Sequence, residues 1–196
     1  TARSTVRVVQ GHQDMLSNFA KCRLSFGTSD MSSKVFKSAE HAYHYVRAIK
    51  CSLSPLAESI LNCQHASAAK RAASKLSGLT NRVDDVHLMW DILSHKAAQC
   101  PPFLEALLAS GDLLLVHSTG PRDVFWGSGL QPDDTANCGT MPGKNVFGKL
   151  LMALRLKVRG EDVPTGLTID SICSEDCPAP RFRRSGRPTP FLYASI

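Results

Sequence analysis

Apolar residues recur every three or four positions in six segments of the chain, and this spacing constrains the fold more than any other feature of the sequence. In the clearest segment they stand at Ala39, Ala42, Tyr43, Val46 and Ile49. Such spacing puts apolar side chains on one face of a helix, which must pack against a core. The predicted helices are residues 39–49 after an N-cap at Ser38, a helix starting at Ser54, residues 66–76, a helix capped by Asp84 or Asp85 and ended by Cys100-Pro101-Pro102, residues 103–109, and residues 146–158 with Asn145 as the cap.

Short β-branched or apolar stretches predict a few strands. These are Thr5–Gln10, Cys22–Phe26 and Ser33–Phe36 around a turn at residues 27–30, and Leu113–His117. They do not alternate with the helices in βαβ order, so we expect an α+β fold: a single compact, mostly helical domain with a few short strands, over residues 5–158. Periodicity fades after Gly160, and residues 159–196 are expected to be a weakly ordered tail.

Composition excludes several classes of protein. Hydrophobic residues make up 43% and charged residues 20%, which is typical of a globular chain. No apolar run approaches the roughly 20 residues that span a bilayer, and we expect neither a membrane partner nor a signal peptide. The seven Cys are irregularly spaced without a CxxC pair, which indicates free thiols in the cytoplasm or nucleus rather than a metal site. We expect a monomer.

The charge is +6, from 23 basic and 17 acidic residues. The excess lies in residues 1–158, with 18 basic and 12 acidic side chains. A basic body attracts phosphate-bearing partners such as nucleotides or nucleic acid, although solubility alone would also account for it.

Glu40, His44 and Arg47 fall on one line of the first predicted helix, at i, i+4 and i+7, beside its apolar face. A carboxylate between a core and a basic residue is partly desolvated and charge-paired, a setting that tunes acids and bases. The alternative interpretation is an ordinary surface Glu–Arg pair.

The long segment Thr119–Gly143 is too long for a passive connector. Asp123, Trp126 and Gly127 within it suit a pocket that stacks a flat ring beside a carboxylate, or alternatively a core Trp and a turn-capping Asp. Gly143-Lys144-Asn145 before a helix offers backbone N–H groups and an ammonium to a phosphate. Asn18 suits a substrate hydroxyl or a turn.

Four clusters in a fixed order resemble the NADAR family, the YbiA-like proteins, from about Leu16 to Arg155. They are Ser17-Asn18-Phe19, Ser38-Ala39-Glu40-His41, Asp123 with Trp126-Gly127, and Gly143-Lys144-Asn145 followed by Gly148 and Leu150-Leu151-Met152. The resemblance implies a compact α+β domain that cleaves a bond between a ribose carbon and a nitrogen. Substrate classes of the family are ADP-ribose on guanine bases and ribosylamino-pyrimidine intermediates of riboflavin synthesis, and no metal or organic cofactor is expected.

Residue by residue, the resemblance implies that Glu40 and Asp123 are catalytic. It also implies substrate contacts from Asn18, Phe19, His44, Arg47, Trp126, Gly127, Lys144 and Asn145. Two positions depart from the family. A Lys commonly stands seven residues after the Glu, where this chain has Arg47, which cannot form a Schiff base. The YbiA type also has a catalytic Trp eight residues before the Met of the fourth helix, where this chain has Asn81.

From these features we expect an N-glycosidase that hydrolyses ADP-ribosylated guanine in nucleic acid or nucleotide, with an ADP-ribose-containing ligand as its partner. A non-catalytic module that binds ADP-ribose or nucleic acid is one alternative, and Arg47 favours it. A glycosidase acting on riboflavin intermediates is the other.

Overall fold

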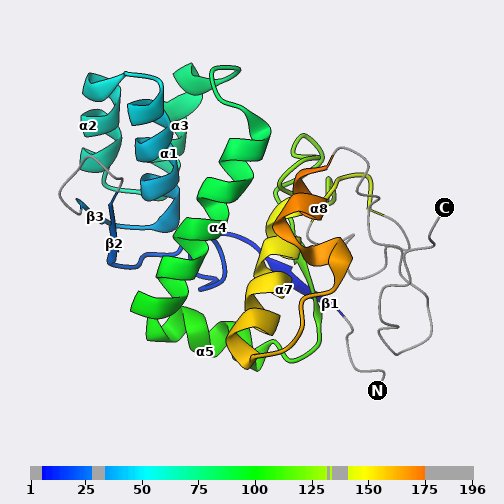
Figure 1. The fold of residues 1–196 in the computed structure, drawn as a ribbon. Coiled ribbons are helices and arrows are strands. Elements are labelled where there is room, and N and C mark those ends of the chain that lie inside the picture. The colour runs from blue at the N-terminus through cyan, green and yellow to red at the C-terminus, as the bar shows by residue number, and fades with distance from the viewer. Residues whose placement is uncertain (1–5, 28–33, 132, 134–140, 175–196) are drawn as a thin grey trace. The chain divides into compact units, whose positions relative to one another are not determined.

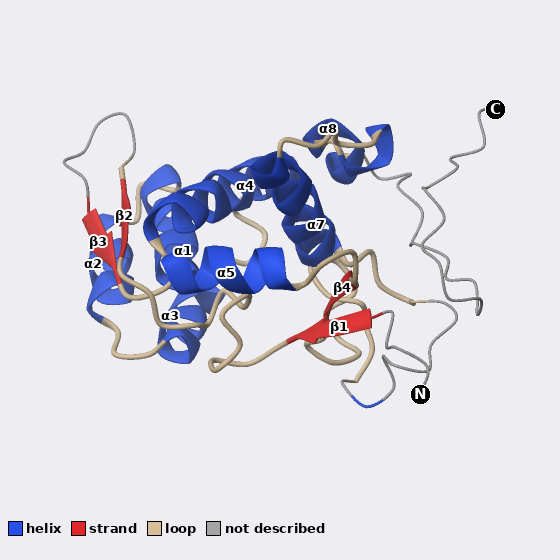
Figure 2. Ribbon diagram, turned by 90° about the horizontal axis from the view of Figure 1, so that it is seen from below, coloured by secondary structure: helices blue, strands red, loops and turns tan. Residues whose placement is uncertain are grey.

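The structure, a computed structural model, describes residues 6–27, 34–131, 133 and 141–174. Within these residues it shows seven α-helices, two short 3₁₀ helices and four short strands (Figures 1 and 2). The chain divides into two compact units, whereas the sequence predicts a single domain. We call Gly11–Ala106 the helical unit, and residues 1–10 together with 107–196 the discontinuous unit. The boundary between them falls within helix α5 (Pro101–Ala109). No described helix is long and apolar enough to cross a membrane.

The helical unit contains an antiparallel hairpin and a set of packed helices. Strand β2 (Leu24–Phe26) pairs with β3 (Lys34–Phe36), with Leu24 opposite Phe36. The turn predicted between them lies mostly outside the described residues. The helices are α1 (Ala39–Lys50), α2 (Ser54–Asn62), α3 (Ala66–Ala72) continued by the 3₁₀ helix η1 (Ala73–Leu76), and α4 (Arg82–Gln99). Their fully buried side chains include Ile60, Leu76, Ile92 and Leu93, and Phe103 of α5 is buried as well.

Helix α1 begins where the sequence predicts. Ser38 is its N-cap, in extended conformation, and its Oγ accepts a hydrogen bond from the amide of His41. The cap places Glu40 in the first turn, where the positive end of the helix dipole favours a negative side chain. Nine of the twelve residues of α1 are buried, so the helix is central to the packing of its unit.

Helix α4 begins earlier than the sequence predicts. The cap is Asn81, whose Oδ1 accepts from the amide of Val83 at 2.9 Å, rather than Asp84 or Asp85. The two Asp residues lie in the first turn, and the Asp85 side chain is engaged by another helix, as described below.

The discontinuous unit is built on a two-stranded parallel sheet. Strand β1 (Val6–Val9) pairs with β4 (Leu114–His117), with Val6 opposite Leu114 (Figure 2). Helix α7 (Val146–Arg159) packs on β4, and its buried residues include Phe147, Leu150, Leu151 and Leu154. The apolar spacing of residues 146–158 predicts this buried face, except that Val158 at its end is 39% exposed.

The predicted weak order of residues 159–196 is wrong for its first part. The 3₁₀ helix η2 (Thr165–Leu167) and helix α8 (Ile169–Cys173) both pack on α7, and Leu167 and Ile172 are buried. These elements are three and five residues long, which is too short for a repeat of apolar residues to reveal them in the sequence. Residues 175–196 lie outside the described part of the chain.

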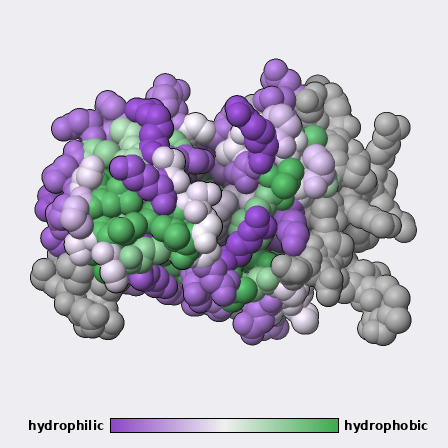
Figure 3. All heavy atoms as spheres, turned by 90° about the horizontal axis from the view of Figure 1, so that it is seen from above, coloured by the Kyte–Doolittle hydropathy of each residue, from purple (hydrophilic) through white to green (hydrophobic). Residues whose placement is uncertain are grey.

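Exposed surface is mixed in character. On the face shown in Figure 3, hydrophilic side chains surround a group of hydrophobic ones at the left. Leu79 and Val83, which are 57% and 41% exposed, are among the large hydrophobic residues that the helical unit leaves exposed. Single exposed hydrophobic residues of this kind are common on soluble proteins.

Candidate active site

Glu40 is a buried carboxylate at the start of α1. Its side chain is 7% exposed, and Oε1 lies 3.1 Å from Nε2 of His44, one turn later. Its backbone amide, one of the groups that a helix start leaves without an intrahelical partner, donates to the carbonyl oxygen of Asn18 at 3.1 Å. These contacts fix the position of Glu40 relative to its own helix and to the segment between β1 and β2 that contains Asn18.

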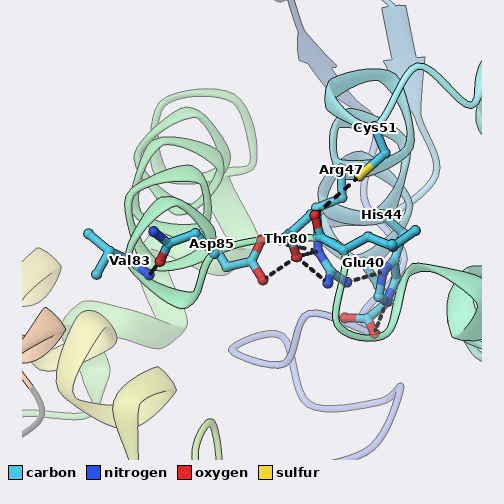
Figure 4. A network of polar contacts seen from close by, with 9 residues as sticks. Glu40, His44, Arg47, Cys51, Thr80, Val83 and Asp85 are labelled. Carbon is cyan, nitrogen blue, oxygen red and sulfur yellow. Dashed lines mark hydrogen bonds and ion pairs between the residues drawn. The ribbon is translucent and has the colours of Figure 1, made fainter.

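His44 stands between Glu40 and Arg47, as the predicted line requires (Figure 4). Nη1 of Arg47 lies 3.5 Å from His44 Nδ1. A guanidinium can only donate, so Nδ1 accepts and the proton of the neutral ring sits on Nε2, facing Glu40. His44 therefore offers Glu40 an N–H group, and Arg47 selects the tautomer in which it does so.

Arg47 is held by residues that come from beyond α1. Its Nε lies 3.0 Å from Asp85 Oδ1, and the side chains of the pair are 13% and 11% exposed. Thr80 accepts from Arg47 Nε at 3.0 Å and donates to Asp85 Oδ2 at 2.9 Å. The guanidinium carbon also lies 5.1 Å from the centre of the Tyr43 ring. Figure 4 shows the resulting chain of contacts from Glu40 to the first turn of α4.

This environment bears on the expected substrate contact of Arg47. Several N–H groups of its guanidinium already contact Thr80, Asp85 and His44. The role that these contacts show for Arg47 is to join α1 to α4 and to orient His44. Sequence reasoning missed Thr80 and Asp85, because nothing in the spacing of α1 points to partners on another element. Burial and the Asp85 carboxylate raise the pKa of Tyr43, so its phenol stays neutral beside them.

The segment between β1 and β2 carries Asn18 and Phe19. Asn18 is 7% exposed, and its Nδ2 lies 3.3 Å from the sulfur of Met89. Within the part of the chain that the structure describes, its Oδ1 is buried without a hydrogen-bond partner. A buried acceptor of this kind is costly unless a donor reaches it, which suits a residue that meets a ligand hydroxyl or amine. Phe19 is half-buried, and the Lys70 ammonium lies 5.4 Å from its ring centre.

His41, which follows Glu40, has a structural role. Its Nδ1 lies 2.8 Å from Ser38 Oγ, and its Nε2 lies 3.2 Å from the carbonyl oxygen of Cys63 at the end of α2. The ring therefore connects the start of α1 to the end of α2. Burial lowers the pKa of His41, which keeps the ring neutral.

In the discontinuous unit, Asp123 shapes its own loop. Its Oδ1 accepts from the amide of Trp126 at 3.0 Å, and its Oδ2 accepts from the hydroxyl of Thr119 at 2.8 Å. Trp126 is half-buried, with its ring edge-on to Phe125 at 5.2 Å between centres. Each carboxylate oxygen keeps further acceptor capacity, so these bonds leave Asp123 able to accept from a ligand.

The predicted phosphate site at Gly143-Lys144-Asn145 has a different structure. The backbone amides of residues 143–147 do not face solvent as free donors: they donate to the carbonyl oxygens of residues 124–128 at 2.8–3.2 Å. The expectation of free N–H groups at this helix start is therefore wrong. A phosphate contact here would rest on the half-buried side chain of Lys144.

The side chain of Asn145 bonds to strand β4 rather than to the first turn of α7. It is fully buried, its Oδ1 accepts from the amide of His117 at 2.9 Å, and its Nδ2 donates to the carbonyl oxygen of Leu115 at 2.9 Å. It makes no side-chain cap for α7 and has a left-handed backbone, with φ of 51°. The carboxamide thus bonds β4 as a neighbouring strand would.

The glycines of the same motif are required by close approach. A Cβ on Gly143 would lie 2.5 Å from the carbonyl oxygen of Gly127, and one on Gly148 would collide with the carbonyl oxygen of Leu115. A Cβ on Gly127 would lie 2.6 Å from Thr119 Oγ1. The small residues of this motif therefore let α7 and the loop approach β4, and the ligand contacts expected of Gly127, Lys144 and Asn145 stay a prediction.

The predicted residues thus form two groups. Asn18, Phe19, Glu40, His44 and Arg47 lie in the helical unit, where backbone and side-chain bonds connect Asn18, Glu40, His44 and Arg47. The discontinuous unit holds Asp123, Trp126, Gly127, Lys144 and Asn145, connected through the amide–carbonyl bonds of residues 124–128 and 143–147. Among the described residues, no three His, Cys, Asp or Glu side chains gather as a metal site would require.

The NADAR domain family matches residues 7–159, which include both groups. The chain belongs to the NADAR family. A curated relative, N-glycosidase R617 of Acanthamoeba polyphaga mimivirus, is 29% identical over 104 residues, which are 50% of this chain. That match spans about 60% of the relative's own length.

The NADAR fold is supported by a solved structure. The NMR structure of the E. coli protein YbiA matches with a TM-score of 0.57, over 84% of this chain and 93% of YbiA. The two sequences are 20% identical, so this likeness concerns the fold. The mixed helix and strand composition predicted from the sequence is confirmed.

Proposed function

We propose that this NADAR protein is an N-glycosidase that hydrolyses the bond between ribose C1 and a guanine nitrogen of ADP-ribosylated guanine, in nucleic acid or nucleotide. Family membership and the name of the mimivirus relative support the general reaction. The observation that carries the proposal is the Glu40 carboxylate, which is buried, held by His44 and adjacent through its backbone to Asn18.

Hydrolysis of such a bond passes through a sugar with cationic character at C1. The C1–N electron pair leaves with the guanine, the oxygen of water bonds to C1, and a proton from the water is returned to the guanine nitrogen. A carboxylate near C1 stabilises the positive charge as it develops, and it does so most strongly where water is excluded. We assign this role to Glu40.

The remaining roles are assigned by chemistry. Asn18 accepts a hydrogen bond from a sugar hydroxyl through Oδ1. For Asp123 and Trp126, which belong to the discontinuous unit, the roles follow from the motifs of the family alone: Asp123 would activate the water or contact the 2-hydroxyl, and Trp126 would offer an aromatic face to a base. His44 donates to Glu40 and keeps its carboxylate oriented. The substrate contact that the resemblance implies for His44 stays a prediction.

The charge of the chain favours a substrate that carries phosphates. With +6 overall, the protein attracts a diphosphate or a nucleic acid more than a small substrate with fewer negative charges. Asn81, which stands where the YbiA type has its Trp, is the exposed N-cap of α4 and offers no aromatic surface. Both features favour ADP-ribosylated guanine over a riboflavin intermediate.

The test is incubation of the protein with an ADP-ribosylated guanine oligonucleotide, followed by chromatography of the products. We expect unmodified oligonucleotide and free ADP-ribose. Binding of the oligonucleotide without product would instead support the binding module. Turnover of a ribosylamino-pyrimidine alone would support the riboflavin alternative.

A further inference from the structure

Lys96, on α4, is a fully buried lysine for which the proposed reaction has no use. Its relative exposure is 0%. Its Nζ donates to the carbonyl oxygen of Ser17 at 2.8 Å and to that of Met15 at 3.0 Å, and it lies 4.5 Å from the centre of the Phe103 ring. Lysine is seldom fully buried, because removing an ammonium from water is costly unless strong partners replace the water. The two carbonyl oxygens and the ring are those partners.

Both carbonyl oxygens belong to the loop that leads to Asn18. The next carbonyl oxygen along, that of Asn18, accepts from the backbone amide of Glu40 at 3.1 Å. Helix α4 contacts this loop at a second point, because the sulfur of Met89 lies 3.3 Å from Asn18 Nδ2. Met89 and Lys96 are seven residues apart and share a face of α4. One helix face thus contacts the loop at Met15 and Ser17 and at the side chain of Asn18, whose carbonyl oxygen accepts from the amide of Glu40.

We infer that Lys96 is a positioning residue: its ammonium fixes the Met15–Asn18 loop, and through that loop it sets the place of Glu40 and of the Asn18 side chain. The inference rests on the proposed function for its catalytic consequence. An apolar residue at position 96 would remove the ammonium from the carbonyl oxygen of Met15, and it would leave that of Ser17 with only the 3.2 Å bond from the amide of Ala20. The loop would then move to find other donors, and the Asn18 carbonyl would move with it.

The protonation of Lys96 gives this role a measurable signature. Burial lowers its pKa to about 8, against the opposing effects of Cys22, Cys100 and Asp14, which also face the amine. Burial in turn raises the pKa of Cys22, so that thiol stays neutral where Lys96 titrates. Above pH 8 the neutral amine donates weaker hydrogen bonds than the ammonium, and the loop is held less firmly.

The experiment compares Lys96→Met with Lys75→Met, which removes an exposed lysine of the same unit. Met keeps an unbranched apolar stem in the space of the lysine and removes its donors. We expect the backbone amide of Glu40 to exchange with solvent at least about tenfold faster in folded Lys96→Met, the effect of losing one or two charged hydrogen bonds. We expect kcat to fall by a similar factor with KM within about threefold, since the loss concerns orientation.

A second arm uses the unmodified protein, in case Lys96→Met does not fold. The protection of the Glu40 amide, corrected for intrinsic exchange, is measured at pH 7 and pH 9.5. We expect it to drop at the higher pH, together with kcat, while protection of the Ala69 amide in α3 is unchanged. Unchanged Glu40 protection in either arm overturns the inference. If the unmodified protein has no glycosidase activity, the exchange measurements still decide the role of Lys96, so the two proposals fail separately.

Discussion

Arg47 and Asp85 form an ion pair in which Nε and Oδ1 are 3.0 Å apart and both side chains are largely buried. The pair joins two helices of the helical unit, with Thr80 bonded to both members. Position 47 is the one at which this chain departs from the lysine common in its family. The ion pair explains why an arginine stands here. Its planar guanidinium contacts Asp85, Thr80 and His44 at once, and a lysine ammonium could not contact all three.

Replacing Arg47 tests this interpretation. We expect Arg47→Ala to lower the free energy of unfolding by about 3 kcal/mol, because it leaves Asp85 charged and unpaired where little water reaches it. Arg47→Lys should lose less, since the charge pair survives. Because that ammonium would face Asp85 and stay protonated, borohydride with substrate should trap no adduct at residue 47. Chemical denaturation and mass spectrometry measure the two effects, and an adduct on Lys at position 47 would contradict the structural role.

Glu40→Gln should abolish turnover and leave the fold intact. The amide keeps an oxygen that accepts from His44, so the local contacts survive while the negative charge is lost. We expect kcat to fall about a hundredfold or more, the usual scale for removing a catalytic carboxylate. The matched control is Glu105→Gln, an exposed residue of α5 in the same unit, which should keep the full rate. A folded Glu40→Gln protein with normal kcat would overturn the assignment.

Gly148→Ala should destabilise the protein by about 1–3 kcal/mol, as overpacking of a core does. The added Cβ would collide with the carbonyl oxygen of Leu115 and with the Asn145 side chain, although Ala is the better helix former. Gly160→Ala is the comparison. It has nothing within 4 Å but a left-handed φ of 71°, so its cost is about 1 kcal/mol of backbone strain. Urea unfolding of both variants separates collision from strain, and equal stability of Gly148→Ala and the unmodified protein would refute the close approach.

Acid should destabilise the fold through His41. Its pKa in the folded protein is lowered from 6.5 by burial, so below pH 6.5 the unfolded chain binds a proton that the folded one does not. The free energy of unfolding therefore falls as the pH decreases from 6.5 towards the folded pKa, and it stays reduced below it. We expect His41→Gln to show a smaller loss of stability than the unmodified protein between pH 7 and pH 5. A parallel decline in both proteins would remove His41 as the cause.

Two truncations separate the two parts of the C-terminal segment. Removal of residues 175–196 should leave kcat within a few-fold, because that stretch shows no apolar periodicity in the sequence. Removal of everything after Gly160 also deletes Leu167 and Ile172, which are buried by η2 and α8 against α7. At about 1.5–3 kcal/mol per buried aliphatic side chain, that protein should melt several degrees lower. Equal melting temperatures would show that η2 and α8 contribute no stability.

Sequence reasoning succeeded where the interacting residues share one element. Glu40, His44 and Arg47 lie on one face because helical spacing puts them there, and Ser38 caps α1 as its residue type predicts. The cap of α4 was wrong, because Asn81, Asp84 and Asp85 all have the capping chemistry and only Arg47, from another helix, decides how Asp85 is used.

The interpretation of Asn145 shows the same limit. Its sequence context before a helix predicts a cap, but its carboxamide reaches β4, about thirty residues earlier in the chain. The roles of Lys96 and of Asn18 Oδ1 were hidden for the same reason, since burial and long-range contacts leave no local periodic signal.

The pairing of β1 with β4 has a consequence for how the protein is made. Val6 lies opposite Leu114, so the ribosome completes the whole of Gly11–Ala106 before β1 has its neighbour. The helical unit can begin to fold while the N–H and C=O groups of β1 still lack their partner strand. An unpaired strand edge of this kind can pair with other chains. Slow translation near residue 106 would prolong that exposure. The yield of native protein should therefore depend on synthesis rate and chaperone supply.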